Sequence, residues 1–233
     1  MSDQQPANHS IKVVDAFDLD DELRSLLKPG EMMRDPEGRR HRLPRYFYEI
    51  PDHEAAVSIR LSHHFGLNEF VLTDLKEAPR LQQFPRYVPC AVRVLAFYLE
   101  QFRREVGASV HIAVNGAYRS PSHKLSQTAT PHMWATAADV YRIGTSILKG
   151  KESIDKYNGI AEDLSDDIHV LPYGHVTGLN ADDHVHLDLG YITVIPREIS
   201  EDRMEVPQEH RPRFAFEDRR RRERRNVPAE TEG

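Results

Sequence analysis

The chain has 233 residues, of which 39% are hydrophobic and 29% are charged, so it is long enough to bury one core and carry tails. Its net charge of -6 argues against a general affinity for nucleic acid or for an anionic membrane. No apolar run is long enough to span a bilayer, and the N-terminus lacks the basic start and apolar centre of a signal peptide. We therefore expect a protein that stays in the cytoplasm as written, or leaves by a non-classical or lysin-type route.

The N-terminal stretch alternates between polar and apolar segments. Residues 1–10 are polar and predicted to be disordered, and apolar spacing predicts a short helix over 20–28, ended by Pro29 and the glycine after it. Charge and two prolines predict a loop over 31–45. The next residues, 45–50, read R-Y-F-Y-E-I and predict a strand.

The clearest helix is predicted over 88–107, where apolar residues recur every three or four positions and a glycine follows. It contains the single cysteine, Cys90, which cannot form an internal disulfide and is expected to be buried and inert. Alternation predicts strands over 109–116, with His111 half-buried, and over 135–143. A loop rich in Ser, Thr and Pro is expected over 120–131.

The C-terminal part is predicted to contain a helix over 151–164, interrupted by Gly159, then a strand and turn over 168–178 and a strand over 183–191. The composition changes after Pro196, and eight arginines fall within fifteen positions. A solvated tail is the favoured interpretation of that run, and contact with an anionic polymer or nucleic acid is the alternative.

Histidine and aspartate gather in two of these segments. His132 and Asp139 are seven residues apart, which suits a loop that enters a strand. In the later strand His184, His186 and Asp188 share one face, so each could approach a metal ion. Two histidines and one carboxylate leave the fourth position open, as in catalytic zinc sites.

Four motifs extend this pattern. They read L-S-H-H-F-G-L-N-E-F at 61–70, G-A-Y-R-S-P at 116–121, T-P-H-M-W-A-T-A-A-D-V at 130–140 and H-V-H-L-D-L at 184–189. Together they resemble the zinc D-alanyl-D-alanine peptidase family, the carboxypeptidases and dipeptidases of the vancomycin-resistance type, whose metal site is shared with the hedgehog signalling domain. The resemblance covers about residues 59–195.

The chain departs from the family pattern at two positions. Thr130 stands where the family has serine, which keeps the hydroxyl, and Ala135 stands where the family has glycine. Alanine fits there only if the backbone keeps a negative φ or the loop adapts.

The resemblance implies one zinc ion per chain, held by His132, Asp139 and His186. It also implies that Asp183 is the general base, with the neighbouring Asp182 as a competing candidate. His184 then donates a proton or hydrogen bond to the tetrahedral intermediate.

The same resemblance assigns Arg119 to the scissile carbonyl or the developing oxyanion. It places Thr130, Ser120 and Trp134 around the substrate. The remaining histidines near these motifs carry no assigned role: His63, His64 and His123.

We therefore expect an α+β domain of the hedgehog/DD-peptidase type, with a small antiparallel sheet and packing helices, over residues 59–196. Residues 1–58 are expected to form a partly disordered N-terminal extension, and 197–233 a charged tail. The expected function is zinc-dependent hydrolysis of peptide bonds in D-amino-acid-containing peptidoglycan peptides, D-Ala-D-Ala carboxypeptidase-like, with neither membrane nor nucleic acid as partner.

Three other functions are compatible with parts of the sequence. The main alternative is a non-catalytic module that keeps the zinc fold for binding. Two histidines and a carboxylate also describe the facial triad of non-haem iron oxygenases, although the spacing of seven is unusual for them. A nucleic-acid binder would rest on the arginine run alone.

Overall fold

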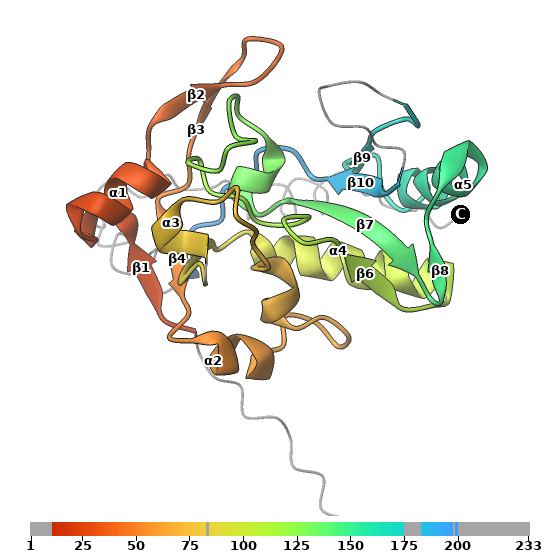
Figure 1. Cartoon of the computed structure of the whole chain (residues 1–233), viewed down its shortest axis with the longest axis horizontal. Coiled ribbons are helices and arrows are strands. Elements are labelled where there is room, and N and C mark those ends of the chain that lie inside the picture. The colour runs from red at the N-terminus through yellow and green to blue at the C-terminus, as the bar shows by residue number, and fades with distance from the viewer. Residues whose placement is uncertain (1–10, 83, 175–182, 198, 200–233) are drawn as a thin grey trace, which may run out of the picture. The chain divides into compact units, whose positions relative to one another are not determined.

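The computed structural model describes residues 11–82, 84–174, 183–197 and 199. These residues form an α+β arrangement with five α-helices and three small antiparallel sheets (Figure 1). The coarse expectation of antiparallel strands with packing helices is confirmed. No helix among these residues is long and apolar enough to cross a membrane. The predicted tail, 197–233, falls almost wholly outside the described residues.

The largest sheet has strand order β6-β7-β10-β9, and β8 pairs with the C-terminal end of β7. Helices α4 and α5 pack against each other and against β7 and β10. The bounds of these elements are β6 Val110–Ile112, β7 Ala137–Ile143, β8 Ser146–Ile147, β9 His169–Val170, β10 Val185–Asp188, α4 Val92–Val106 and α5 Gly150–Glu162.

Helix α4 confirms the predicted apolar period, since Leu95, Leu99 and Phe102 are buried on one side of it. It ends where expected, at Gly107, whose positive φ of 65° forms the left-handed cap. Val88 is not helical, because it belongs to the strand before the helix.

Helix α5 runs through Gly159 without the predicted interruption. Its buried residues on either side, Asn158 and Ala161, pack into the domain. That packing outweighs the roughly 1 kcal/mol that a glycine costs inside a helix.

A second sheet, with strand order β1-β4-β5, pairs two strands from the first 50 residues with a strand at 87–89. The predicted strand over 45–50 is confirmed as β4, and it pairs with β5 through Tyr48 and Val88. This strand pairing therefore joins the predicted N-terminal extension, residues 1–58, to the domain predicted to begin at residue 59. The elements of this part are β1 Val13–Asp15, α1 Asp21–Leu27, β4 Tyr46–Glu49, α2 His53–Ser58, α3 Pro79–Gln82 and β5 Tyr87–Pro89.

The loop predicted over 31–45 is wrong, because β2 (Met32–Arg34) and β3 (Arg40–Arg42) form a hairpin there. Its turn is closed by Asp35, whose carboxylate accepts the backbone N–H of Arg39 at 2.8 Å. The arginines that suggested a loop point outward, while Met33 and His41 face the domain. In both short strands two exposed residues flank one half-buried residue, and the high charge of the segment led to the prediction of a loop.

Candidate metal centre

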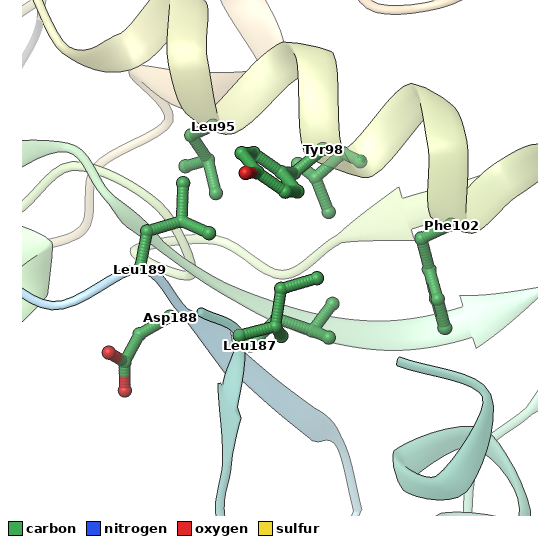
Figure 2. A pocket seen from close by; sticks show the side chains of 8 residues that line it. Leu95, Tyr98, Phe102, Leu187, Asp188 and Leu189 are labelled. Atoms are coloured by element: carbon green, nitrogen blue, oxygen red, sulfur yellow. The ribbon is translucent and has the colours of Figure 1, made fainter. Parts of the chain in front are cut away.

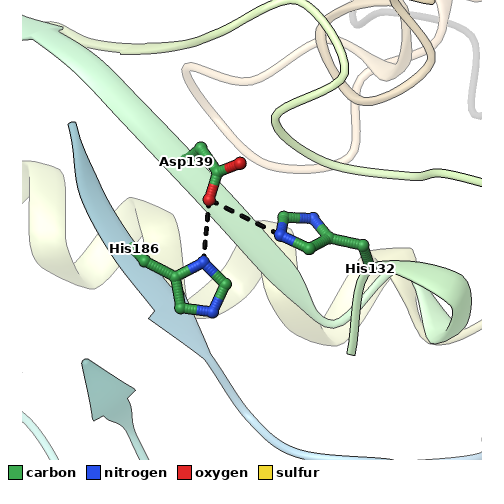
Figure 3. Close-up of side chains that lie close together, drawn as sticks. All are labelled: His132, Asp139 and His186. Atoms are coloured by element: carbon green, nitrogen blue, oxygen red, sulfur yellow. Dashed lines mark hydrogen bonds and ion pairs between the residues drawn. The ribbon is translucent and has the colours of Figure 1, made fainter. Parts of the chain in front are cut away.

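Two of the predicted ligands lie opposite each other on neighbouring strands. Asp139 of β7 and His186 of β10 are register partners, and His186 Nδ1 lies 2.7 Å from Asp139 Oδ1 (Figure 3). The backbone of Asp139 is fixed as well, because it bonds to Gly116 O at 2.6 Å and to Ala113 N at 2.9 Å. A side chain at Gly116 would come within 2.9 Å of the Asp139 carbonyl, so the approach of these segments requires glycine.

The third ligand comes from a short 3-10 helix, η3 (Pro131–Trp134). His132 Nδ1 lies 2.7 Å from the carbonyl oxygen of Ala117, which can only accept, so this nitrogen carries the proton. The other nitrogen, Nε2, faces Asp139 Oδ1 at 3.5 Å. His132, Asp139 and His186 are buried, each offers a ligand atom within 4.8 Å of the others, and the group could hold a metal ion.

The ionisation of His132 and Asp139 suits a cation, whereas that of His186 opposes one. Burial lowers the pKa of His132 to about 4, and the nearby Arg119 guanidinium acts in the same direction, so its ring is neutral at pH 7. Burial alone would raise the pKa of Asp139, but the two histidines hold it well below its usual range. Burial opposes protonation of His186, yet hydrogen bonds to Asp139 and Asp188 raise its pKa to about 9. A metal ion at this site must therefore displace a proton from His186.

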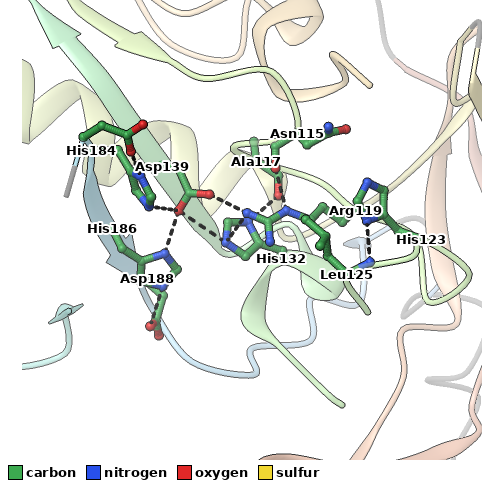
Figure 4. Close-up of polar contacts among 11 residues, drawn as sticks. Asn115, Ala117, Arg119, His123, Leu125, His132, Asp139, His184, His186 and Asp188 are labelled. Carbon is green, nitrogen blue, oxygen red and sulfur yellow. Dashed lines mark hydrogen bonds and ion pairs between the residues drawn. The ribbon is translucent and has the colours of Figure 1, made fainter. Parts of the chain in front are cut away.

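Arg119 belongs to the same cluster (Figure 4). Its Nη2 contacts Asp139 Oδ2 and lies 3.1 Å from His132 Nε2, while its Nε donates to the carbonyl of Asn115 at 2.6 Å. The side chain is almost fully buried. The segment G-A-Y-R-S-P thus places Arg119 in contact with the ligand group.

The predicted acid–base residues lie at the edge of the cluster. His184 Nε2 is 3.7 Å from Asp139 Oδ1, and its Nδ1 lies 2.8 Å from Asp183 Oδ1. The Asp183 side chain is 74% exposed and reaches the ligand group only through His184. Asp182, the competing candidate, lies outside the described residues.

The three residues expected around the substrate have different surroundings. Ser120 is buried, and its Oγ donates to Glu77 Oε1 at 2.6 Å. Trp134 is buried in an apolar cluster with Leu43, Ala129 and Met133. Thr130 is half-buried and immediately precedes η3. Ser120 and Trp134 are therefore engaged in internal contacts.

Ala135 adopts the left-handed conformation with φ of 56°, so the condition of a negative φ is not met. Its N–H donates to the carbonyl of His132 at 3.1 Å and ends η3. The loop keeps the conformation that favours glycine, at a cost of about 1 kcal/mol for alanine.

Sequence reasoning missed one acidic residue that supports this region. Glu77 is buried and accepts hydrogen bonds from Ser120 and Ala78, and no sequence signal marked it. Asp188, which strand alternation placed on the metal-facing side without assigning it a role, contacts His186.

The unassigned histidines lie in other contacts. His64 binds Glu100 at 2.7 Å, and His63 packs edge-on against His64. His123 is buried with its Nε2 3.5 Å from Asp74 Oδ1. None of the three belongs to the described ligand group.

Comparison of the chain with protein-family models, with curated proteins and with solved structures found no match. A functional assignment therefore depends on the chemistry of the site and on the sequence motifs.

Proposed function

We propose that the protein is a zinc-dependent peptidase of the hedgehog/DD-peptidase fold type, acting on D-amino-acid-containing cell-wall peptides in the manner of a D-Ala-D-Ala carboxypeptidase. The observation that carries this proposal is the buried group of His132, Asp139 and His186 with Arg119 in contact. Metal-assisted hydrolysis of a peptide bond uses a cation-binding group together with a fixed donor for developing negative charge, and these four residues offer both.

The donor set fits zinc. Two imidazole nitrogens and one carboxylate oxygen are the ligands of many catalytic zinc sites. His132 is already held in the tautomer whose Nε2 carries the lone pair. That nitrogen now faces Arg119 Nη2 at 3.1 Å, a contact that a metal ion would replace. When bound, zinc supplies a Lewis acid and lowers the pKa of a bound water to about 7.

The residues around the group have separate tasks. Arg119 provides the planar guanidinium that orients a peptide carbonyl and stabilises negative charge on its oxygen. His184 holds or releases a proton at Nε2, the atom 3.7 Å from Asp139. Asp183 orients the His184 ring from its solvent side.

The substrate class is supported by the motifs at 61–70, 116–121, 130–140 and 184–189, which resemble those of the D-alanyl-D-alanine peptidases. D-alanine-containing peptides of peptidoglycan are the substrates that this resemblance implies.

The test combines metal analysis with mass spectrometry of muropeptides. We expect close to one zinc per chain and release of D-amino-acid-containing products, with His132→Ala or His186→Ala losing most of the zinc. Arg119→Lys keeps a charge but loses the planar fork, so turnover should fall while zinc is retained. Wild-type zinc content in both histidine variants would refute the proposed site.

A non-catalytic zinc module is the second candidate, and one observation favours it. Asp183, the expected base, is exposed and contacts His184 instead of the ligand group. Asp183→Asn separates the two functions, because an enzyme that transfers the proton through Asp183, directly or by way of His184, should lose turnover by roughly 10²–10⁴, whereas a binding module should keep its zinc affinity. Zinc binding with no cleavage of any muropeptide by the wild type would establish the module.

A further inference from the structure

His186 lies between two carboxylates on the same face of the sheet. Its Nδ1 is 2.7 Å from Asp139 Oδ1, and its Nε2 is 3.2 Å from Asp188 Oδ2 (Figure 4). One ring therefore has both nitrogens engaged, one by a predicted ligand and one by a residue outside the ligand group.

The residues around Asp188 fix the position of its carboxylate. Its Oδ1 accepts the N–H of Gly190 at 2.8 Å. Its neighbours Leu187 and Leu189 pack toward α4, while the carboxylate points away from that apolar pocket (Figure 2). Across the ladder its register partner is Ala137, whose small side chain leaves room on the same face. The carboxylate is thus largely buried and oriented toward His186.

The two histidines of the site present different nitrogens to it. His132 gives its Nδ1 proton to the carbonyl of Ala117, so Nε2 faces Asp139. His186 has the opposite arrangement, with Nδ1 facing Asp139 and Nε2 facing Asp188. A histidine that ligates through one nitrogen is oriented by the partner of the other.

We propose that Asp188 is a positioning residue, which accepts the Nε2 proton of His186 and so makes Nδ1 the metal-binding atom. This inference rests on the proposed zinc site. Asp188 is not a ligand, because it contacts the nitrogen on the far side of the ring. Its carboxylate fixes the tautomer and ring orientation and makes Nδ1 a stronger donor.

The first experiment measures the zinc dissociation constant of the full-length protein by competition with a chelator. Loss of such a partner weakens metal binding by about 10–100-fold, which we expect for Asp188→Ala. Asp188→Asn keeps an acceptor oxygen without the charge, so its loss should be smaller. The control is Asp166→Ala, an exposed carboxylate outside the described ligand group.

The thermal midpoint of each metal-free variant shows whether the fold is retained. If Asp188→Ala does not fold, Asp188→Asn is the deciding variant, and weaker zinc binding than in the Asp166→Ala control supports the proposal. Zinc affinity equal to that of the wild type in a folded Asp188→Ala or, failing that, in Asp188→Asn refutes it.

The second experiment identifies the ligating nitrogen. NMR-active cadmium in isotopically labelled protein should couple to Nδ1 of His186 and to Nε2 of His132 in the wild type. Coupling to Nε2 of His186 would overturn the proposal whatever the affinities. A wild type that binds neither zinc nor cadmium would refute the proposed metal site, whereas metal binding unaffected by Asp188 substitutions refutes only this inference.

Discussion

The two halves of the candidate site are positioned by different means. Asp139 and His186 belong to adjacent strands, and the ladder places them directly opposite each other. His132 follows a long loop, and its position depends on contacts made by residues far away in the sequence. One of these is the hydrogen bond from Ala129 N to Arg34 O, at 2.8 Å, which ties the loop to the N-terminal hairpin.

The hairpin secures the loop through a stack of rings. The His41 ring lies on the Tyr191 ring with centroids 3.5 Å apart, and Trp134 meets Tyr191 edge-on at 5.0 Å. Asp35 binds His41 Nε2 at 2.8 Å from the buried side, and Tyr191 donates to the carbonyl of Ala129 at 3.2 Å. The β2–β3 hairpin, which precedes residue 59, therefore helps to hold His132 in position.

Strand pairing fixes a residue through many neighbouring hydrogen bonds, so one substitution seldom moves its partner. A loop depends on a few contacts of high sequence separation, each of which can be removed singly. We therefore expect the His132 half of the site to respond to distant substitutions, and the strand half only to changes within it.

The strand half of the site should be disrupted only by a substitution within it, and Asp139 is the residue that its other members share. Asp139→Ala leaves Arg119 and His186 buried without their shared carboxylate, so the free energy of unfolding should fall by about 3–5 kcal/mol. Urea unfolding of the metal-free protein measures this loss. Asp139→Asn, which keeps the shape but not the charge, is the comparison, and a loss in Asp139→Ala no larger than that of a surface substitution would contradict the expectation.

The loop half should be sensitive to His41, although this residue lies outside the site. His41→Ala removes the stack on Tyr191 and a hydrogen bond to a buried carboxylate, and it should cost about 1–2 kcal/mol of stability. Zinc affinity should also fall, because the loop carrying His132 loosens. Arg40→Ala, on the outward face of the same hairpin, is the matched control, and equal behaviour of the two variants would show that the hairpin does not support His132.

A third region, the contact of Glu100 with the loop at 61–66, should make the stability of the fold depend on pH. Burial raises the pKa of Glu100, but hydrogen bonds from His64, Arg103 and Ser62 lower it to about 2, from an ordinary value of 4.5. A carboxylate with a depressed folded-state pKa stabilises the fold above pH 4.5, and this contribution is lost as pH falls toward 2.

We expect about 1 kcal/mol of acid-dependent stability from this contact, after allowance for solvent screening. It would show that the loop at 61–66, like the His132 loop, depends on contacts with residues distant in the sequence. Denaturant unfolding across this pH range should give a shallower acid slope for Glu100→Gln than for the wild type. Parallel slopes would assign the acid sensitivity to other carboxylates.

The smallest expected effect is local to the loop half. Ala135→Gly relieves the left-handed backbone that follows His132, and it should raise stability by about 0.5 kcal/mol after the entropy cost of glycine in the unfolded chain. Thermal unfolding checks this. A decrease in stability would mean that the buried methyl group contributes more than the strain removes.

The sequence by itself determined the features set by backbone periodicity. The three- and four-residue spacing of apolar side chains predicted α4, and alternation placed His184, His186 and Asp188 on one face of a strand. These two predictions worked because such periods follow from local helix and strand geometry. The family resemblance, and not the seven-residue spacing, implied that His132 and Asp139 share a site, and in the structure His132 Nε2 lies 3.5 Å from Asp139 Oδ1.

Only the tertiary structure decided which atoms meet. The contact of His132 Nδ1 with Ala117 and the docking of the hairpin on Tyr191 both join positions that no local period relates. Such contacts depend on how separate segments pack, and a hydrogen bond or ring stack is made or lost over shifts of about 1 Å. A sequence pattern therefore predicts the residues of this site, while long-range packing determines their roles.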